Sequence, residues 1–76
     1  MDAMKPEKAL SVIVPVYNST ATLAELVARL NAALSSVTPK YEILLVNDGS
    51  EDDSWATIRG LAQAHAAVRG IDLMRN

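Results

Sequence analysis

The fold of this 76-residue chain is decided by residues 41–54, YEILLVNDGSEDDS. Within that stretch, residues 43–46 form a continuous apolar run that does not alternate. The run predicts a strand over Glu42–Val46 that is buried on both faces, as in a parallel sheet. The run breaks at Asp48-Gly49, a pair typical of turns. Ser50 and Asp53 resemble a capping box, so a helix is expected to begin there. The stretch thus predicts a strand, an acidic turn and a helix start.

Upstream of this stretch, the sequence predicts a first strand over Leu10–Val16, preceded by a flexible lead-in over residues 1–9. Three β-branched residues favour a buried strand here, and Pro15 is expected at its end because proline has no N–H to donate. After a turn at residues 17–20, helical spacing predicts one buried stripe made of Leu23, Leu26, Val27, Leu30, Leu34 and Val37. The outer side of that helix is expected to carry Glu25, Arg29 and Asn31.

Downstream, a second helix is expected over about residues 52–66 and a third strand over about Val68–Met74, although Gly70 weakens the strand assignment. The buried side of this helix is expected to hold Trp55, Ile58, Leu61 and Ala62. Strands that alternate with helices predict an α/β fold, β-α-β-α-β, with a parallel sheet and right-handed crossovers. Residues 10–76 would then form half of a doubly wound, Rossmann-like nucleotide-binding domain.

The topology also predicts an open sheet edge. The strand order of this fold begins 3-2-1-4, so the first strand should be central, but a fourth strand would have to come from beyond Asn76. An apolar edge without a guarding charge is a template for pairing with another chain. We therefore expect a homodimer in which two first strands pair around Val12–Val14 in one six-stranded sheet. The alternatives are exchange of an element between two chains and a monomer in which residues 1–8 fold back over the edge.

Composition excludes several classes of protein. Seven basic and nine acidic residues give a formal charge of −2, which does not favour nucleic-acid binding. Because there is no cysteine, disulfides and thiolate metal sites are excluded. No signal peptide is evident, and no apolar run reaches the roughly 20 residues that cross a bilayer. A cytoplasmic chain is expected.

The turn after the first strand has no glycine, which excludes a dinucleotide fingerprint or a P-loop there. A nucleotide could still bind by its base and ribose, stacking on Tyr17 and donating a base N–H to Asp48. The alternatives are that Tyr17 is a partly buried turn residue and that Asp48 only forms the turn. Asp48 together with the acids at 51–53 could imitate a metal site. The alternative for the acids at 51–53 is that acids are favoured in a first helical turn in any case. His65 is expected at the surface.

Three motifs in order carry a resemblance to a known family: residues 14–18 (VPVYN), residues 41–50 with Asp52 close behind, and residues 73–76 (LMRN). From Leu10 onward the chain resembles the start of a family 2 glycosyltransferase, and within that family the polyprenyl-phosphate branch. The resemblance implies a GT-A fold, a UDP- or GDP-sugar donor, a polyprenyl-phosphate acceptor and a divalent metal, Mg or Mn. It also implies that the nucleotide is bound by Pro15, Val16, Tyr17, Asn18, Asp48 and Gly49.

Two residues depart from the family pattern: Asn47 stands where the family often has aspartate, and Ser19 where it often has glutamate. The family's Asp-x-Asp metal motif and catalytic base come after residue 76. No catalytic or metal-binding residue is therefore assigned, and these 76 residues alone are expected to bind no metal and to be inactive. A non-enzymatic α/β binding or assembly module, or an unrelated nucleotide-binding enzyme, are the alternatives, since fold does not fix function.

Overall fold

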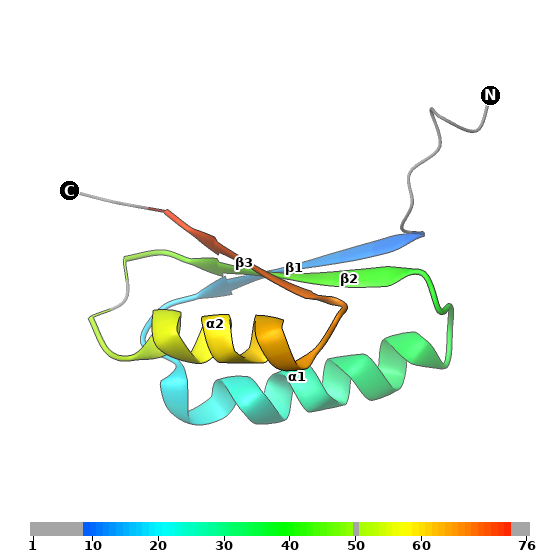
Figure 1. Ribbon diagram of the computed structural model, residues 1–76, viewed down its shortest axis with the longest axis horizontal. Helices are drawn as coiled ribbons and strands as arrows, with labels where there is room; N and C mark the ends of the chain where they lie inside the picture. Colours follow the sequence, from blue (N-terminus) through cyan, green and yellow to red (C-terminus); the bar gives the residue numbers. More distant parts are fainter. Residues whose placement is uncertain (1–8, 50, 74–76) are drawn as a thin grey trace.

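The computed structural model describes residues 9–49 and 51–73, which form a three-stranded parallel sheet and two helices (Figure 1). The elements are β1 (Leu10–Val16), α1 (Thr20–Ser35), β2 (Tyr41–Asn47), α2 (Ser54–Ala64) and β3 (Val68–Asp72). The strand order is β1-β2-β3, with both pairs parallel. The predicted β-α-β-α-β fold is confirmed, including the bounds of the first strand. Apart from Ala9, the expected lead-in lies outside the described residues.

Both helices lie on the same face of the sheet (Figure 1). This is the outcome expected when two right-handed crossovers step the same way across a sheet. On that face the strands contribute the buried side chains of Val16, Ile43, Leu45 and Val68, none more than 3% exposed. They pack with Leu23, Val27 and Ile58 from the two helices in a single core cluster.

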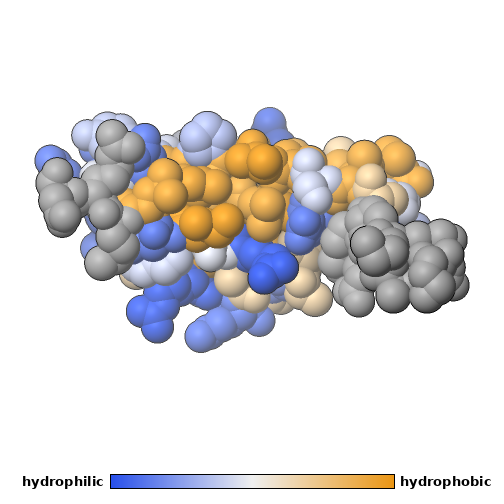
Figure 2. Space-filling model, turned by 90° about the horizontal axis from the view of Figure 1, so that it is seen from above, coloured by the Kyte–Doolittle hydropathy of each residue, from blue (hydrophilic) through white to orange (hydrophobic). Residues whose placement is uncertain are grey.

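The opposite face of the sheet is open. Side chains alternate along a strand, so residues 13, 15, 44, 46 and 71 point away from the helices. Ile13 is 67% exposed and Ile71 is 42% exposed. Figure 2 shows an apolar band running along this side of the molecule. The prediction that β2 is buried on both faces is therefore wrong for the described residues, because both helices cover the same face and leave the opposite face open.

The predicted stripe of α1 needs two corrections. Leu23 and Val27 are buried, and Leu30 and Leu34 pack partly buried against the core, as predicted. Leu26 is 38% exposed, because a stripe through 23, 27, 30 and 34 leaves it on the rim. Val37 is 71% exposed, because the helix ends at Ser35, before the chain reaches it.

The last two elements are shorter than predicted. The helix α2 begins at Ser54, and its N-cap residue, Asp53, makes no side-chain capping bond. The proposed capping box is therefore wrong, and its other member, Ser50, lies outside the described residues. The strand β3 ends at Asp72, which leaves Leu73 beyond it, while residue 74 lies outside the described part.

Gly70 belongs to β3 after all, and packing explains why a glycine is there. A β-carbon at this position would lie 2.5 Å from Cγ2 of Ile58 and 3.2 Å from the Trp55 ring. The missing side chain thus lets α2 approach the sheet closely.

Candidate functional site

The carboxyl ends of β1 and β2 bring the predicted nucleotide-binding residues together. Val16 pairs with Asn47 in register, so the next residues, Tyr17 and Asp48, leave adjacent strands side by side. The Asp48 N–H donates to the Val16 carbonyl at 2.9 Å, which extends the ladder one step past the strands. Ligands of open α/β sheets bind beyond this edge. The structure therefore places Tyr17 and Asp48 side by side at this edge.

The two residues present different surfaces. Tyr17 is 58% exposed, so its ring is accessible for stacking. Asp48 is half-buried, and it is followed by Gly49, whose φ of 71° suits glycine. Val16 is only 1% exposed, so it offers a ligand little beyond its main chain. The binding roles of these residues stay predictions.

The turns that follow β1 and β2 are joined by side-chain hydrogen bonds. Asn18 Oδ1 accepts from the Glu51 N–H at 2.8 Å, and Ser54 Oγ accepts from the Ser19 N–H at 2.8 Å. Asp52 Oδ2 accepts from the Thr20 N–H at 3.3 Å. Sequence reasoning missed this network, because bonds between residues more than 30 positions apart leave no periodic pattern.

Asp52 is the titratable group of this network. Hydrogen bonding from the Ser54 side chain, opposed by partial desolvation and reinforced by the N–H groups of Ser54 and Thr20, holds the pKa of the Asp52 carboxyl below its ordinary value. Each of its oxygens accepts a main-chain hydrogen bond: Oδ1 from Ser54 at 2.9 Å and Oδ2 from Thr20. This carboxylate thus holds the main chain of both turns.

The asparagine that departs from the family pattern has a structural partner. Asn47 is 4% exposed, and its Nδ2 donates to Asp72 Oδ1 at 3.0 Å, which links the ends of β2 and β3. An aspartate at position 47 would instead set two carboxylates against each other. Asn47 Oδ1 is buried, with no hydrogen-bond partner among the described residues. The amide at this position is explained by its neighbour on the next strand.

The described residues do not fit a divalent metal. Calcium and magnesium need several oxygen ligands that converge on one point. In residues 9–49 and 51–73, no three histidine, aspartate or glutamate side chains gather in that way. No catalytic step is therefore assigned to a metal held by these residues.

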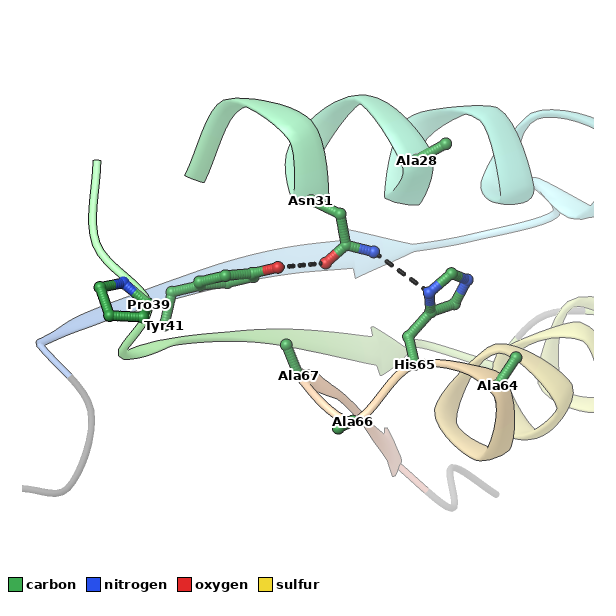
Figure 3. Close-up of a pocket in the computed structure, with 8 residues that line it drawn as sticks. All are labelled: Ala28, Asn31, Pro39, Tyr41, Ala64, His65, Ala66 and Ala67. Atoms are coloured by element: carbon green, nitrogen blue, oxygen red, sulfur yellow. Dashed lines mark hydrogen bonds between the residues drawn. The ribbon is translucent and has the colours of Figure 1, made fainter. Parts of the chain in front are cut away.

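A groove lies at the other end of the sheet (Figure 3). It has a volume of about 650 Å³, and its lining residues are Ala28, Asn31, Pro39, Tyr41, Ala64, His65, Ala66 and Ala67. Tyr41 starts β2 and Ala67 precedes β3, so the groove is at the amino ends of these strands. The volume of this groove would suit a ligand, whereas ligands of open α/β sheets bind at the opposite edge, beyond the carboxyl ends of the strands. The polar groups of the groove bind one another rather than facing a ligand.

Figure 3 shows those polar groups in a row. The Tyr41 hydroxyl donates to Asn31 Oδ1 at 2.8 Å, and Asn31 Nδ2 lies 3.3 Å from His65 Nδ1. Two predictions are wrong here. Asn31 does not lie on the outer side of α1, and His65 is half-buried at the end of α2 rather than on the surface. The row ties α1, β2 and the α2–β3 loop together.

Comparison with known proteins gives a match along nearly the whole chain. The model of glycosyl transferase family 2 matches residues 11–76.

In the described residues, neither helix is both long enough and apolar enough to span a membrane.

Among similar proteins are undecaprenyl-phosphate 4-deoxy-4-formamido-L-arabinose transferases from three bacteria. The one from Klebsiella pneumoniae subsp. pneumoniae is 43% identical over 72 residues, which cover 93% of this chain and 22% of the relative. That from Aeromonas hydrophila is 40% identical over 91% of this chain and 22% of its own length. That from Serratia proteamaculans is 40% identical over 100% of this chain and 24% of its own length. The chain thus spans less than a quarter of these relatives.

Proposed function

Because the chain belongs to glycosyl transferase family 2, we propose that it forms the nucleoside-binding part of a nucleotide-sugar-dependent glycosyltransferase. The observation that supports this is the placement of Tyr17 beside Asp48 at the carboxyl edge of the sheet. The base of a UDP- or GDP-sugar would stack on Tyr17 and donate an N–H to Asp48. The names of the relatives favour a polyprenyl phosphate as the acceptor.

In the proposed reaction, an oxygen of the acceptor phosphate attacks the anomeric carbon of the sugar. The bond from that carbon to the diphosphate breaks as the new carbon–oxygen bond forms, and the nucleoside diphosphate leaves. Family resemblance implies a divalent metal, Mg or Mn, in the whole enzyme, but the described residues supply no ligands for it. A polyprenyl-phosphate acceptor would be a membrane lipid, so we propose that the whole enzyme works at a membrane, at its cytoplasmic face.

The test is a titration with UDP and with GDP, followed by amide chemical shifts. No described residue is assigned to the phosphates of the nucleotide. We therefore expect a dissociation constant in the millimolar range, which corresponds to a binding free energy of about −4 kcal/mol. Shifts should appear at Tyr17, Asp48 and Gly49, while those of Asn31 and His65 at the far end serve as an internal control. Tyr17→Ala should weaken binding at least fivefold, because base–aromatic stacking contributes about 1–3 kcal/mol. Shifts that avoid the carboxyl edge would refute the nucleoside site.

The same samples test activity. We expect no sugar transfer by these 76 residues at any Mg or Mn concentration, since no described residue is assigned to the chemical step. Transfer or donor hydrolysis above background that disappears on Asp48→Ala would show that this assignment is incomplete.

An assembly role is the second candidate, favoured by the free edge of β1, which pairs only with β2 among the described residues. On the β2 side of the strand, the Leu10 N–H donates to the Lys40 carbonyl and the Val16 carbonyl accepts from the Asp48 N–H. Main-chain groups alternate along a strand, so Ser11, Ile13 and Pro15 direct theirs outward. Proline is tolerated at such an edge. We propose that two copies pair antiparallel through this edge, and light scattering at tens of micromolar should give the mass of a dimer.

A further inference from the structure

The two turns at the carboxyl edge are held together by three side chains, which we call the clamp: Asn18, Asp52 and Ser54. Asn18 Oδ1 accepts from the Glu51 N–H at 2.8 Å and lies 3.4 Å from the Asp52 N–H. Ser54 Oγ accepts from the Ser19 N–H at 2.8 Å, and its own N–H donates to Asp52 Oδ1 at 2.9 Å. Every clamp residue bonds main chain, so the clamp fixes the path of both turns.

Two features show that these contacts are specific to this arrangement. Asn18 has a φ of 49°, a left-handed conformation that asparagine tolerates better than most residues do. Ser54 is fully buried in a helix whose other fully buried residue is Ile58, so a polar side chain occupies a core position. A buried hydroxyl is costly unless it is hydrogen-bonded, and here its bonds reach the other turn.

The clamp lies next to the two residues that would contact a nucleoside. Tyr17 immediately precedes Asn18, and its ring is mostly exposed, so its own packing restrains it little. The Asp48 N–H donates to the Val16 carbonyl of β1, and the clamped residues 51–54 follow shortly after Asp48 in the chain. The relative position of Tyr17 and Asp48 depends on how firmly the two turns are joined.

We propose that the clamp residues are positioning residues that hold Tyr17 and Asp48 at the spacing a nucleoside requires. The inference rests on the proposed function, because it concerns the same site. It changes the role expected for Asn18, whose side-chain oxygen is used within the protein rather than for a ligand. Binding to turns that are already ordered avoids the entropy cost of ordering them around the ligand. Removing the clamp should therefore weaken nucleotide binding even when the fold is intact.

The experiment compares two substitutions of Asn18. Asn18→Gly allows the left-handed backbone but removes the acceptor oxygen. Asn18→Asp keeps an acceptor, and it is made together with Asp53→Asn so that the net charge of the chain is unchanged. Affinity for whichever of UDP and GDP shifts the unmodified chain should fall about threefold to tenfold in Asn18→Gly, as expected when preorganisation is lost. It should stay within about twofold of the unmodified chain in the double variant, because the acceptor is restored.

Asp53→Asn alone is the matched control, since Asp53 is exposed and its side chain is not part of the clamp. It should bind as the unmodified chain does. If Asn18→Gly does not fold, as judged by its amide spectrum, Asp52→Ala replaces it, because Asp52 is exposed and its removal leaves no cavity. The same loss of affinity is expected.

The outcomes separate the inference from the proposed function. If the unmodified chain binds nucleotide and a folded Asn18→Gly or Asp52→Ala binds it equally well, the clamp has no positioning role and only the inference is overturned. If neither UDP nor GDP shifts any resonance at the carboxyl edge of the unmodified chain, the proposed nucleoside site is wrong and the inference falls with it. Loss in Asn18→Gly with recovery in the charge-matched Asn18→Asp supports both.

Discussion

The two faces of the sheet are made by the same strands but have different surroundings. On the helix face, Ile43 and Leu45 are fully buried, whereas their neighbours Leu44 and Val46 on the other face are half-buried. The sequence is apolar on both faces, yet the described chain covers only one. An apolar run thus indicates that a strand can be buried, whereas the path of the crossovers decides which of its faces is covered.

The difference in burial between the two faces is tested most directly by substituting two adjacent leucines of β2. Leu45→Ala should lower the free energy of unfolding by about 3 kcal/mol, because it leaves a cavity in the core. A domain of this size is stable by only roughly 4–11 kcal/mol, so much of the fold's stability would be lost. Leu44→Ala should cost about 1 kcal/mol or less, since its side chain already meets solvent. Urea titration followed by Trp55 fluorescence measures both.

Measurements at several protein concentrations provide the control for the variants Leu45→Ala and Leu44→Ala. If Leu44→Ala costs as much as Leu45→Ala, the open face is covered in solution. A dependence of the Leu44→Ala cost on protein concentration would then identify a second copy as the cover. Equal and concentration-independent costs would contradict the difference between the faces.

The second prediction concerns the polar end of the helix face. Asn47→Asp should destabilise the fold by about 2 kcal/mol at neutral pH, because it buries a carboxylate beside Asp72. Burial and the neighbouring carboxylate should raise the pKa of the carboxyl introduced at position 47 above its value in the unfolded chain. The penalty should therefore grow as the pH rises through the ordinary carboxyl range and be relieved near pH ~4, where one carboxyl can be protonated and donate. Urea titrations at several pH values measure it.

The exchanged pair is the control for this prediction. Asn47→Asp combined with Asp72→Asn restores one amide and one carboxylate across β2 and β3. It should recover most of the lost stability and remove the pH dependence. If the single and the exchanged variants are equally unstable, burial of the charge at position 47, and not its partner, sets the cost.

Most of the fold could be predicted from the sequence, because its elements are defined by local patterns. The β-branched run gave the bounds of β1, and helical spacing found Leu23 and Val27. The errors come from contacts that local patterns do not record. Asn31 is polar, which predicts the outer side, but it lies four residues after Val27 and three before Leu34, and Tyr41 and His65 supply its hydrogen bonds.

The candidate site could be predicted only in outline. That Tyr17 and Asp48 would share one edge follows from parallel strands, whose carboxyl ends meet there. The clamp could not be predicted, because Asn18 and Ser54 act on main-chain groups of the other turn. In the sequence both are ordinary turn and cap residues. Only register and crossover geometry bring them together.

The smallest effect is expected on the open face, at Ile13. Its side chain is 67% exposed and points away from the helices, so Ile13→Thr should change the free energy of unfolding by less than about 0.5 kcal/mol. Threonine keeps the β-branch that suits a strand, and it keeps the N–H. Ile13→Pro removes that N–H, which points to the free edge of β1 rather than to β2.

The two substitutions of Ile13 distinguish association through the free edge of β1 from association through the open face of the sheet. Pairing through the β1 edge uses main-chain groups, so a dimer should survive Ile13→Thr and be lost in Ile13→Pro, with light scattering as the measurement. Pairing through the open face uses apolar side chains, so Ile13→Thr would itself weaken the dimer. That result would overturn the edge dimer and assign the association to the open face. Because Pro15 already leaves the edge one donor short, removing the donor at residue 13 takes away the centre of the proposed pairing.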